Sequence, residues 1–314
     1  MDSKDNNWPL ILGKAIIGKS EIHLRNRGSG VRIPPAAPNL TNLPVTDSVL
    51  VLNQLGILRL RWGQVTDDQN VQNLVREKVW TELRKVGRPD SRFHWDFSSF
   101  IADFEGSEEA ALRLTQLDAW KQSSLFFIAP DNSTEPVRRK AIEEGKSFLM
   151  TTYGIRRGFL LLRAGVVPKG DERYAATLDG MDRYATPVSL SEIKTLGMVG
   201  LLVTGGSGVT RTGLRVGKGH GFFDVECAIL SELGVMSDQS VIADIVHDCQ
   251  IVDLVVEPTP NDVGVHLIVT PTQTLEVASP VKGPGRILWE LIPGTEFDEM
   301  ETIHELARLT GHTE

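Results

Sequence analysis

The segment SLFFIAPDNSTEPVRRKAIEEGKSFLMTT, residues 124–152, gives the clearest indication of the fold class. It begins with the short apolar run SLFFIA, which has the length and composition of a buried strand. The turn residues PDNS follow, and a helix is predicted to begin near Ser133 and to end at Gly145. The next apolar run, SFLMTT, predicts a second strand. This stretch therefore predicts a strand, a helix and a strand in succession.

The same alternation continues on both sides of this stretch. Before it, one helix is predicted to end at Gly87 and a second helix to begin after Ser107. The first of these helices is indicated by apolar residues at helical spacing: Val71, Leu74, Val75, Val79 and Leu83. After the stretch, strands are predicted at 200–204, 241–246 and 266–270, with a helix at 225–233. Strands that alternate with helices predict an α/β fold with a mainly parallel sheet covered on both faces.

The composition limits the classes of function. The 314 residues are 41% hydrophobic and 24% charged, and the net charge is −8. An acidic balance disfavours nucleic acid or an anionic membrane as the main partner. No apolar run approaches the roughly 20 residues of a membrane span, and Lys14 interrupts the apolar run PLILGKAIIG near the N-terminus. Two cysteines in apolar surroundings, Cys227 and Cys249, indicate free thiols, so we expect a cytoplasmic protein.

The first 64 residues have no sustained helical or strand period. Their segment GSGVRIPPAAP, residues 28–38, fits a flexible leader rich in proline and glycine. It also fits translation through a transfer-RNA gene, because VRIP is one reading of the conserved T-loop sequence of such genes. No methionine lies between Met1 and Met150, so this second interpretation requires a GTG or TTG start codon, best placed at Val65, with Val45, Val49 and Leu60 as alternatives.

These patterns predict three parts of the chain. Residues 1–64 are expected to be a disordered or artefactual extension, and residues 65–282 to form the α/β domain. Residues 283–314 are expected to be a loosely packed tail with a short helix around 299–309. The oligomeric state is left open.

The segment VGKGHGFFD, residues 216–224, is the main candidate for a functional site. Its three glycines alternate with other residues, and it lies between a predicted strand and a predicted helix. Backbone amides of a glycine-rich segment at a helix N-terminus bind anions such as phosphate. Arg215 and Lys218 would add positive charge, and Asp224 is suited to a divalent metal ion on the phosphates. The spacing fits a phosphate-binding loop and a glycine turn packed on the sheet equally well.

This segment resembles the loop R-x-G-x-G-x-G-Y-Y-D of the 5-formyltetrahydrofolate cyclo-ligase family, also called methenyltetrahydrofolate synthetases. The likeness is closer to a divergent branch, the methenyltetrahydrofolate synthase domain-containing proteins, where the loop reads approximately G-K-G-E-G-[FY]-A-[DE]-L-E. The likeness extends over about residues 72–275 and includes four further segments: REKVW (76–80), FEGSEEAALRLTQLDAW (104–120), VHDCQIVD (246–253) and NDVGVHLIVTPT (261–272).

The resemblance implies a three-layer α/β/α sandwich and an ATP-dependent ring closure. In that reaction the N5-formyl oxygen of 5-formyltetrahydrofolate attacks the γ-phosphate of MgATP, N10 attacks the phosphorylated imine, and phosphate leaves. The same chemistry on a related formylated heterocycle is a second possible activity. A non-catalytic paralogue that binds nucleotide or folate and has a regulatory role is the main alternative, and a scaffold for protein contacts is a weaker one.

The resemblance also implies roles for individual residues. Lys218 and Arg215 would be catalytic, and Asp224 and Asp262 would hold Mg²⁺. ATP and substrate would contact a larger set: Arg76, Arg215, Gly217, Lys218, Gly219, His220, Gly221, Phe222 and Phe223.

Five positions depart from the family pattern. Gln72 stands at the position of a lysine thought to reach the ATP phosphates, and Phe222-Phe223 replaces a pair of tyrosines. Ser133 falls near the position of a substrate-contacting glutamate, and Gly200 replaces an aspartate. Because each change removes a polar contact, we expect the chain to bind MgATP and to convert 5-formyltetrahydrofolate slowly or not at all.

Two further pairs of polar residues were considered as functional sites. His247 and Asp248 follow each other at the end of a predicted buried strand, where neighbouring side chains point to opposite faces, so a structural role is expected. Arg156 and Arg157 are candidates for binding the glutamate tail of a folate.

Overall fold

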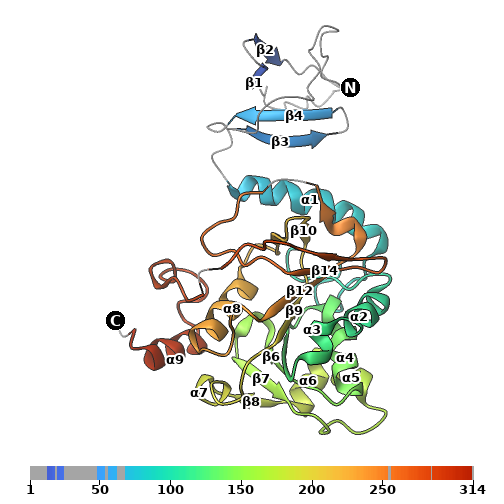
Figure 1. The fold of residues 1–314 in the computed structure, drawn as a ribbon, viewed down its shortest axis with the longest axis vertical. Helices are drawn as coiled ribbons and strands as arrows, with labels where there is room; N and C mark the ends of the chain where they lie inside the picture. Colours follow the sequence, from blue (N-terminus) through green and yellow to red (C-terminus); the bar gives the residue numbers. More distant parts are fainter. Residues whose placement is uncertain are drawn as a thin grey trace, which may run out of the picture. The chain divides into compact units, whose positions relative to one another are not determined.

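The computed structural model describes residues 13–17, 20–24, 48–53, 56–61 and 68–312, except 254, 255 and 284, with side chains from residue 72 onward. The chain divides into two compact units, Met1–Asp67 and Asp68–Glu314 (Figure 1). In the first unit, the described residues form two antiparallel hairpins, β1 (Gly13–Ile17) with β2 (Ser20–Leu24) and β3 (Ser48–Asn53) with β4 (Gly56–Arg61). These strands lie where the sequence predicted no regular structure. The segment 28–38 lies outside the described residues, so its origin in a transfer-RNA gene stays a prediction.

An eight-stranded sheet forms the centre of the second unit, in the order β15-β14-β12-β9-β5-β6-β7-β8. The neighbours from β14 to β6 pair in parallel, whereas β15, β7 and β8 are antiparallel to their neighbours. The prediction of a mainly parallel sheet is therefore confirmed. The bounds of the strands are β5 (Leu125–Ile128), β6 (Ser147–Thr151), β7 (Phe159–Leu162), β8 (Thr186–Val188), β9 (Leu201–Thr204), β12 (Val241–Ile245), β14 (Leu267–Val269) and β15 (Thr274–Glu276).

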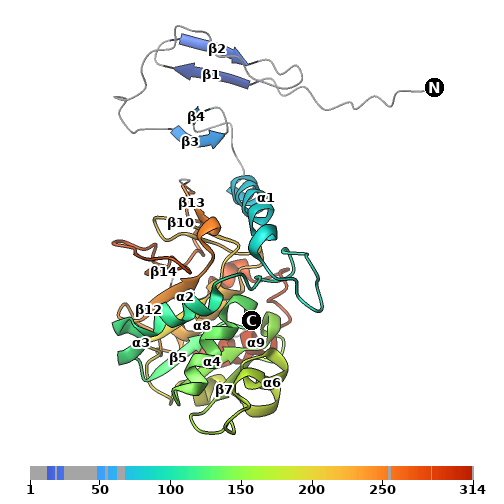
Figure 2. The same ribbon diagram turned by 90° about the vertical axis from the view of Figure 1, so that its right-hand side faces the viewer.

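Helices cover both faces of this sheet, which confirms the predicted three layers. Successive side chains of a strand enter different cores: Phe126 packs in the core under α2 and α4, and Phe127 packs in the core under α8 and α9. In Figure 2, α2, α3 and α4 lie in front of the sheet and α8 and α9 behind it. The helices are α1 (Asp68–Val86), α2 (Ser107–Thr115), α3 (Asp118–Gln122), α4 (Glu135–Glu143), α5 (Glu172–Ala175), α6 (Leu178–Tyr184), α7 (Leu190–Ile193), α8 (Phe222–Glu232) and α9 (Glu301–Thr310).

A small three-stranded sheet carries the chain into the glycine-rich loop. Its central strand β10 (Gly208–Thr210) pairs in parallel with β13 (Ile251–Val252) and antiparallel with β11 (Arg215–Val216). Val75 and Val79 of α1 pack in one apolar cluster with Val216 and Val252 of this sheet. This packing brings the N-terminal helix next to a loop about 140 residues later in the chain. The described residues of this unit also form four short 3₁₀ helices: η1 (Asn132–Thr134), η2 (Tyr153–Ile155), η3 (Asp248–Gln250) and η4 (Trp289–Leu291).

The C-terminal segment is packed, and the expectation of a loose tail is wrong. The short helix predicted around 299–309 is present as α9, but the segment before it also enters the core beside α8. Its buried apolar side chains are Ile287, Ile292, Phe297, Ile303 and Leu306. Each such side chain stabilises the fold by about 1.5–3 kcal/mol when fully buried. The widely spaced apolar residues of 283–300 hid this packing, because an irregular segment has no helical or strand period.

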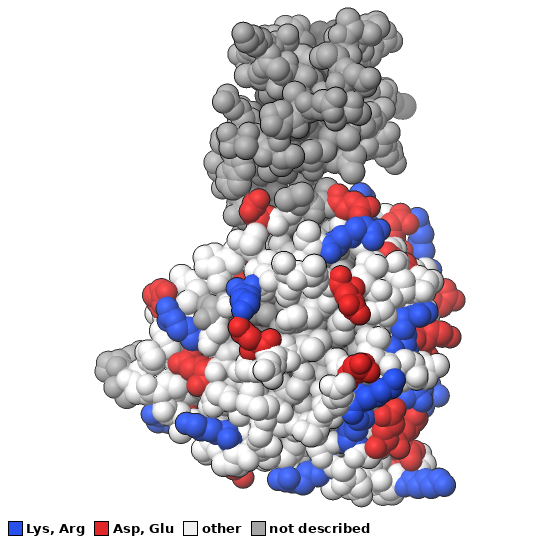
Figure 3. Space-filling model, viewed as in Figure 1, with Lys and Arg blue, Asp and Glu red and all other residues white. Residues whose placement is uncertain are grey.

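The surface has charges of both signs, as the content of charged residues in the sequence suggests. Lysine and arginine are interspersed with aspartate and glutamate on the face shown in Figure 3. None of the helices in the described part of the chain is long and apolar enough to cross a membrane. Both cysteines are free thiols, and burial raises the pKa of Cys249 to about 11, which keeps that thiol protonated and unreactive.

Candidate functional site

A cavity of about 420 Å³ opens where three parallel strands end. Asp131 follows β5, Tyr153 follows β6 and Gly205 follows β9, and all three residues line the cavity. The glycine-rich loop, the start of α8 and the segment 286–297 complete its wall. Open parallel sheets bind ligands at the carboxyl ends of their strands, so the topology makes this cavity the candidate site.

The cavity brings together all the residues to which the resemblance assigned a catalytic, ligand-binding or metal-binding role. They come from α1, β11, the glycine-rich loop, α8 and the loop before β14, which are distant from one another in sequence. The lining includes Arg76, Arg215, Gly217, Lys218, Gly219, His220, Gly221, Phe222, Phe223, Asp224 and Asp262. Gln72, the residue at the position of the family lysine, lines the cavity as well.

The loop has the backbone of an anion-binding segment. Gly219 and Gly221 have φ angles of +114° and +73°, a region that side chains other than glycine rarely adopt. At Gly217 an added Cβ would lie 3.0 Å from Nη1 of Arg215, so a side chain there would displace the arginine. Gly221 is the N-cap of α8 and gives no side-chain hydrogen bond to the first turn of the helix. The first-turn N–H groups are therefore available to an anionic ligand.

Arg76 is fixed on α1 so that it faces this loop. Its Nε donates to the carbonyl oxygen of Gly217 at 2.7 Å, its Nη1 to Oδ1 of Asn73 at 2.5 Å and its Nη2 to Oε1 of Gln72 at 3.0 Å. Burial lowers the pKa of Arg76, but an arginine remains charged at neutral pH. Gln72 therefore orients Arg76, a role that the sequence did not suggest.

Arg215 and Asp224 form a buried ion pair beneath the loop. Nη2 of Arg215 lies 3.2 Å from Oδ2 of Asp224, and the two side chains are 7% and 15% exposed. The Arg215 guanidinium also lies 4.8 Å from the centre of the Phe223 ring. Burial raises the pKa of Asp224, and the charge of Arg215 and a hydrogen bond from the Val263 N–H act against that shift.

Two acids predicted to hold a metal ion, Asp224 and Asp262, are neighbours on the cavity wall. The protein already uses Asp224, because Oδ1 accepts from the Val263 N–H at 3.0 Å and Oδ2 pairs with Arg215. Oδ2 of Asp262 accepts from the Thr259 N–H at 2.6 Å. Within the described ranges, no three His, Cys, Asp or Glu side chains are grouped to hold a metal ion. The pair fits Mg²⁺ that brings most of its ligands with it as phosphate oxygens and water.

Three more acids lie at or below the cavity floor, and the sequence did not single them out as functional. Glu226 on α8 accepts a hydrogen bond from the Thr151 hydroxyl at the end of β6, and burial raises its pKa to about 8, with Asp131 adding to the shift. Oδ2 of Asp131 accepts from the Gly205 N–H at 2.9 Å. Asp244 on β12 is wholly buried, and burial raises its pKa to about 8 in spite of the charge of Arg215.

Aromatic and apolar side chains form the other half of the cavity. Lys218 donates to the Ser99 carbonyl oxygen at 3.0 Å and lies 4.6 Å from the centre of the Tyr153 ring. The apolar lining of this half includes Phe100, Phe222, Leu288, Leu291, Ile292 and Phe297. The cavity therefore has a cationic, glycine-rich half and an apolar half.

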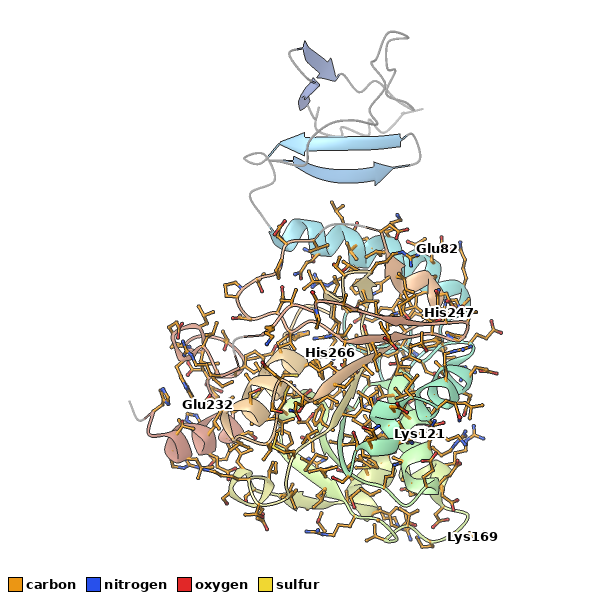
Figure 4. The ribbon with its side chains drawn as sticks, viewed as in Figure 1. Glu82, Lys121, Lys169, Glu232, His247 and His266 are labelled. Atoms are coloured by element: carbon orange, nitrogen blue, oxygen red, sulfur yellow. The ribbon has the colours of Figure 1, made fainter. Side chains whose placement is uncertain are left out.

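The C-terminal segment is tied to this cavity from two sides. His220 of the loop lies 2.7 Å from Glu296, and its ring stacks on Phe222. Glu232 at the end of α8 accepts from the Ile287 N–H at 2.9 Å (Figure 4). His220 thus contacts the protein's own C-terminal segment, which the sequence had placed outside the domain.

The remaining candidates lie outside the cavity. His247 (Figure 4) accepts from the Cys249 N–H at 3.1 Å, and Asp248 accepts from Thr270 at 2.7 Å, so the two cap turns rather than form a catalytic pair. Arg157 pairs with Asp182 at 2.7 Å, and neither Arg156 nor Arg157 lines the cavity. The structure therefore does not support a folate-tail site at these arginines.

Comparison with known sequences agrees with this arrangement. The model of the 5-formyltetrahydrofolate cyclo-ligase family matches residues 68–271. The chain belongs to this family. Among its relatives are the methenyltetrahydrofolate synthase domain-containing proteins of Danio rerio, 29% identical over 75% of this chain, and of Homo sapiens, 30% identical over 68% of it.

These matches span part of the relatives. The aligned region covers 61% of the Danio rerio protein and 56% of the human protein. Among solved structures, the NMR structure of Aquifex aeolicus 5,10-methenyltetrahydrofolate synthetase is 15% identical, with a TM-score of 0.41 over 67% of this chain and 94% of that one.

Proposed function

We propose that this member of the cyclo-ligase family binds MgATP and closes the ring of a formylated reduced folate or of a related formylated heterocycle. One observation supports this most strongly: the glycine-rich loop, Arg76 and Lys218 share a single cavity with an apolar, aromatic half. The cationic, glycine-rich half is suited to the phosphates of a nucleotide, and the apolar, aromatic half is suited to the ring of a planar heterocycle.

The nucleotide phosphates are proposed to lie on the loop. The backbone at Gly219 and Gly221 leaves room for phosphate oxygens, and the first-turn N–H groups of α8 face them. Arg76 supplies a charged, oriented guanidinium at the same place. Mg²⁺ bound to the phosphates would neutralise part of their charge, with Asp262 and Asp224 as the nearest carboxylates.

In the proposed reaction, the protein mainly has to position the two substrates and to stabilise the negative charge on the transferring phosphoryl group. The formyl oxygen takes the γ-phosphoryl group from ATP, and ADP is released. A second nitrogen of the substrate, N10 in a folate, then attacks the activated carbon, and phosphate leaves with the former formyl oxygen. Lys218 is the side chain suited to the transferring phosphoryl group, because its ammonium is held by a carbonyl and by aromatic rings and has a further N–H to donate.

A binding protein without turnover is the second candidate, because Gln72 replaces a cation. In this structure Gln72 accepts a hydrogen bond from Arg76. It therefore helps to orient Arg76 beside the glycine-rich loop but adds no positive charge there. Binding should then be retained while stabilisation of the transferring phosphate is reduced. We therefore expect MgATP binding together with slow conversion.

The test combines calorimetry with an absorbance assay. MgATP is titrated into the protein, and the formation of 5,10-methenyltetrahydrofolate from 5-formyltetrahydrofolate is followed with and without ATP. Lys218→Met should lower turnover by about a hundredfold or more, since oriented donors to the transferring group contribute on this scale. Lys169→Met is the matched control, because Lys169 is an exposed lysine that does not line the cavity (Figure 4).

The outcomes separate the candidates. Turnover that requires ATP supports the ligase, and MgATP or folate binding without turnover supports the binding protein. If neither MgATP nor any reduced folate binds, both candidates are wrong.

A further inference from the structure

The glycine-rich loop is held from two sides. On one side, Arg76 of α1 donates to the carbonyl oxygen of Gly217 at 2.7 Å. On the other side, the C-terminal segment 286–297 contacts the loop. The match to the family model ends at residue 271, so this second support comes from beyond the matched region.

Two adjacent residues of the C-terminal segment make these contacts. Oε1 of Glu296 lies 2.7 Å from Nδ1 of His220, and both side chains are nearly half exposed. The ring of Phe297 meets the ring of Phe222 edge to face, with the ring centres 5.6 Å apart. The Phe222 ring also stacks on the His220 ring, with their centres 5.3 Å apart. Both contacts therefore act on one stacked pair of loop side chains.

The C-terminal segment is anchored to the domain independently of the loop. Ile287 and Phe297 are buried in the core beside α8. The Ile287 N–H donates to Oε2 of Glu232 on α8 at 2.9 Å. The turn that carries the contacts is closed by Asp298, whose Oδ2 accepts from the Gly294 N–H at 2.9 Å. The two side chains that touch the loop are therefore held in place.

The loop depends on such support because its own backbone has wide conformational freedom. Gly219 and Gly221 are exposed, and glycine adopts more backbone angles than any other residue. A Cβ added at Gly221 would meet no atom within 4 Å, so the surrounding atoms do not confine this position. Ordering a loop at the moment of binding lowers affinity, and contacts that order it beforehand recover that loss. The side chains of His220 and Phe222 are the means by which the protein can order this turn.

We propose that Glu296 and Phe297 are positioning residues, which hold the glycine-rich loop in the conformation that binds an anionic ligand. The inference rests on the proposed function, which makes the ligand a nucleotide triphosphate, and deepens it by identifying what orders the loop. Glu296 does not line the cavity, so it acts through His220. Phe222 suits this arrangement, because it stands where the family pattern has a tyrosine and its ring packs against Phe297.

The charge of Glu296 has the opposite effect on an anion. A carboxylate near the loop repels phosphate, so its removal raises the affinity if charge alone matters. The exposed pair of Glu296 and His220 also contributes little to the stability of the whole fold. A variant that loses the contact and a variant that loses only the charge therefore separate positioning from electrostatics.

Four variants of the full-length protein make this separation. Glu296→Ala removes both the contact and the charge, whereas Glu296→Gln removes the charge but keeps a hydrogen-bonding group for His220. Phe297→Leu keeps an apolar side chain in the core and removes the ring. Glu299→Ala is the matched control, because Glu299 is an exposed acid close to Glu296 in sequence that does not line the cavity.

The first measurement is the affinity for MgATP in calorimetry. Glu296→Ala and Phe297→Leu should each weaken binding by about twofold to tenfold, the scale of one exposed ion pair or one aromatic contact. Glu296→Gln should bind at least as tightly as the intact protein, because the hydrogen bond is kept and the repulsion is removed. Glu299→Ala should leave the affinity unchanged.

The second measurement is the rate of tryptic cleavage after Lys218 without nucleotide, followed by mass spectrometry. This rate reports how often the loop leaves its folded conformation. It should rise by about twofold to tenfold in Glu296→Ala and Phe297→Leu. Cleavage after Lys169, an exposed lysine that does not line the cavity, should stay the same and serves as the internal reference.

The outcomes keep this inference distinct from the proposed function. If MgATP binds and both contact variants behave like the control, the positioning role is refuted while nucleotide binding stands. Tighter binding by both variants at position 296 also refutes it, because Glu296 would then act by charge alone. Faster cleavage at Lys169 as well as Lys218 would mean a general loss of stability and would refute it too. If the intact protein does not bind MgATP, the proposed function fails, and the cleavage rate after Lys218 alone decides whether the C-terminal segment orders the loop.

Discussion

Replacing the buried carboxyl of Asp244 by an amide should stabilise the protein at neutral pH. Asp244 is wholly buried on β12, and neither of its oxygens has a hydrogen-bond partner among the described residues. It also lies close to Arg215 across Gly206, where an added Cβ would be 3.1 Å from Oδ2 of Asp244 and 3.3 Å from Cγ of Arg215. Burial nevertheless dominates and raises the pKa of Asp244 from 3.8 to about 8.

The magnitude follows from linkage between proton binding and folding. The folded chain keeps the Asp244 proton up to about pH 8, whereas the unfolded chain releases it near 3.8, so the contribution of Asp244 is fully present below pH 3.8 and is lost as pH rises to about 8. One pH unit in this window corresponds to about 1.4 kcal/mol. At pH 7 the acid is therefore less favourable by about 4 kcal/mol than at pH 4, a loss that asparagine does not share.

The assay is urea unfolding of the intact protein and of Asp244→Asn at about pH 5, 6.5 and 8. The stability difference in favour of asparagine should grow with pH by about 1.4 kcal/mol per unit, because the amide does not titrate. Any fixed effect of burying an amide leaves this slope unchanged. Asp179→Asn, which alters an exposed acid on α6, should show a difference that is nearly independent of pH.

A stability difference between Asp244→Asn and the intact protein that stays constant over this range would refute the reasoning. It would mean that Asp244 is ionised in the folded protein. The carboxylate would then have to be stabilised mainly by Arg215.

Three other changes have expected outcomes. Arg76→Lys removes a fork of three hydrogen bonds, to Gly217, Asn73 and Gln72, and should weaken MgATP binding in calorimetry by about tenfold to a hundredfold. The loss of these bonds should also lower the urea midpoint, but the protein should remain folded during the titration. An unchanged affinity would place the phosphates elsewhere. Gly219→Val places a side chain at an exposed position with φ +114°, which costs about 1–3 kcal/mol of backbone strain. The change should abolish MgATP binding without unfolding the core. Intact binding would show that the loop does not contact the nucleotide. Arg138→Met leaves buried carbonyl oxygens without donors and should lower the free energy of unfolding, measured in urea, by about 3 kcal/mol or more. A loss below about 1 kcal/mol would show that water replaces the guanidinium.

Local patterns predicted most of the central fold, because each pattern depends only on residues that are close together in the sequence. The apolar run at 124–129 became β5, and the helix predicted from Ser133 to Gly145 became η1 and α4. Strands β7 and β8 were missed. Each is only three or four residues long, and β8 contains Pro187, so neither gives a period that can be recognised without its partner.

The glycine-rich loop was found for a different reason. Gly219 and Gly221 adopt backbone angles that exclude most other residues, so the sequence records the local conformation directly. The neighbouring charges of Arg215 and Lys218 then indicated an anion site, and the resemblance to the family added Arg76 and Asp262.

Hydrophobic period and glycine conformation are local properties, so the sequence alone predicted the strands β5, β6, β9, β12 and β14, most of the longer helices, and the loop whose backbone suits an anion. Only the tertiary structure decided that β9 lies between β5 and β12, and hence that Asp131, Glu226 and the glycine-rich loop meet at one cavity. Only it decided that the C-terminal segment closes the same cavity through Glu296 and Phe297. Such contacts join residues separated by up to about 140 positions, and they depend on strand order and side-chain packing, which no local period encodes.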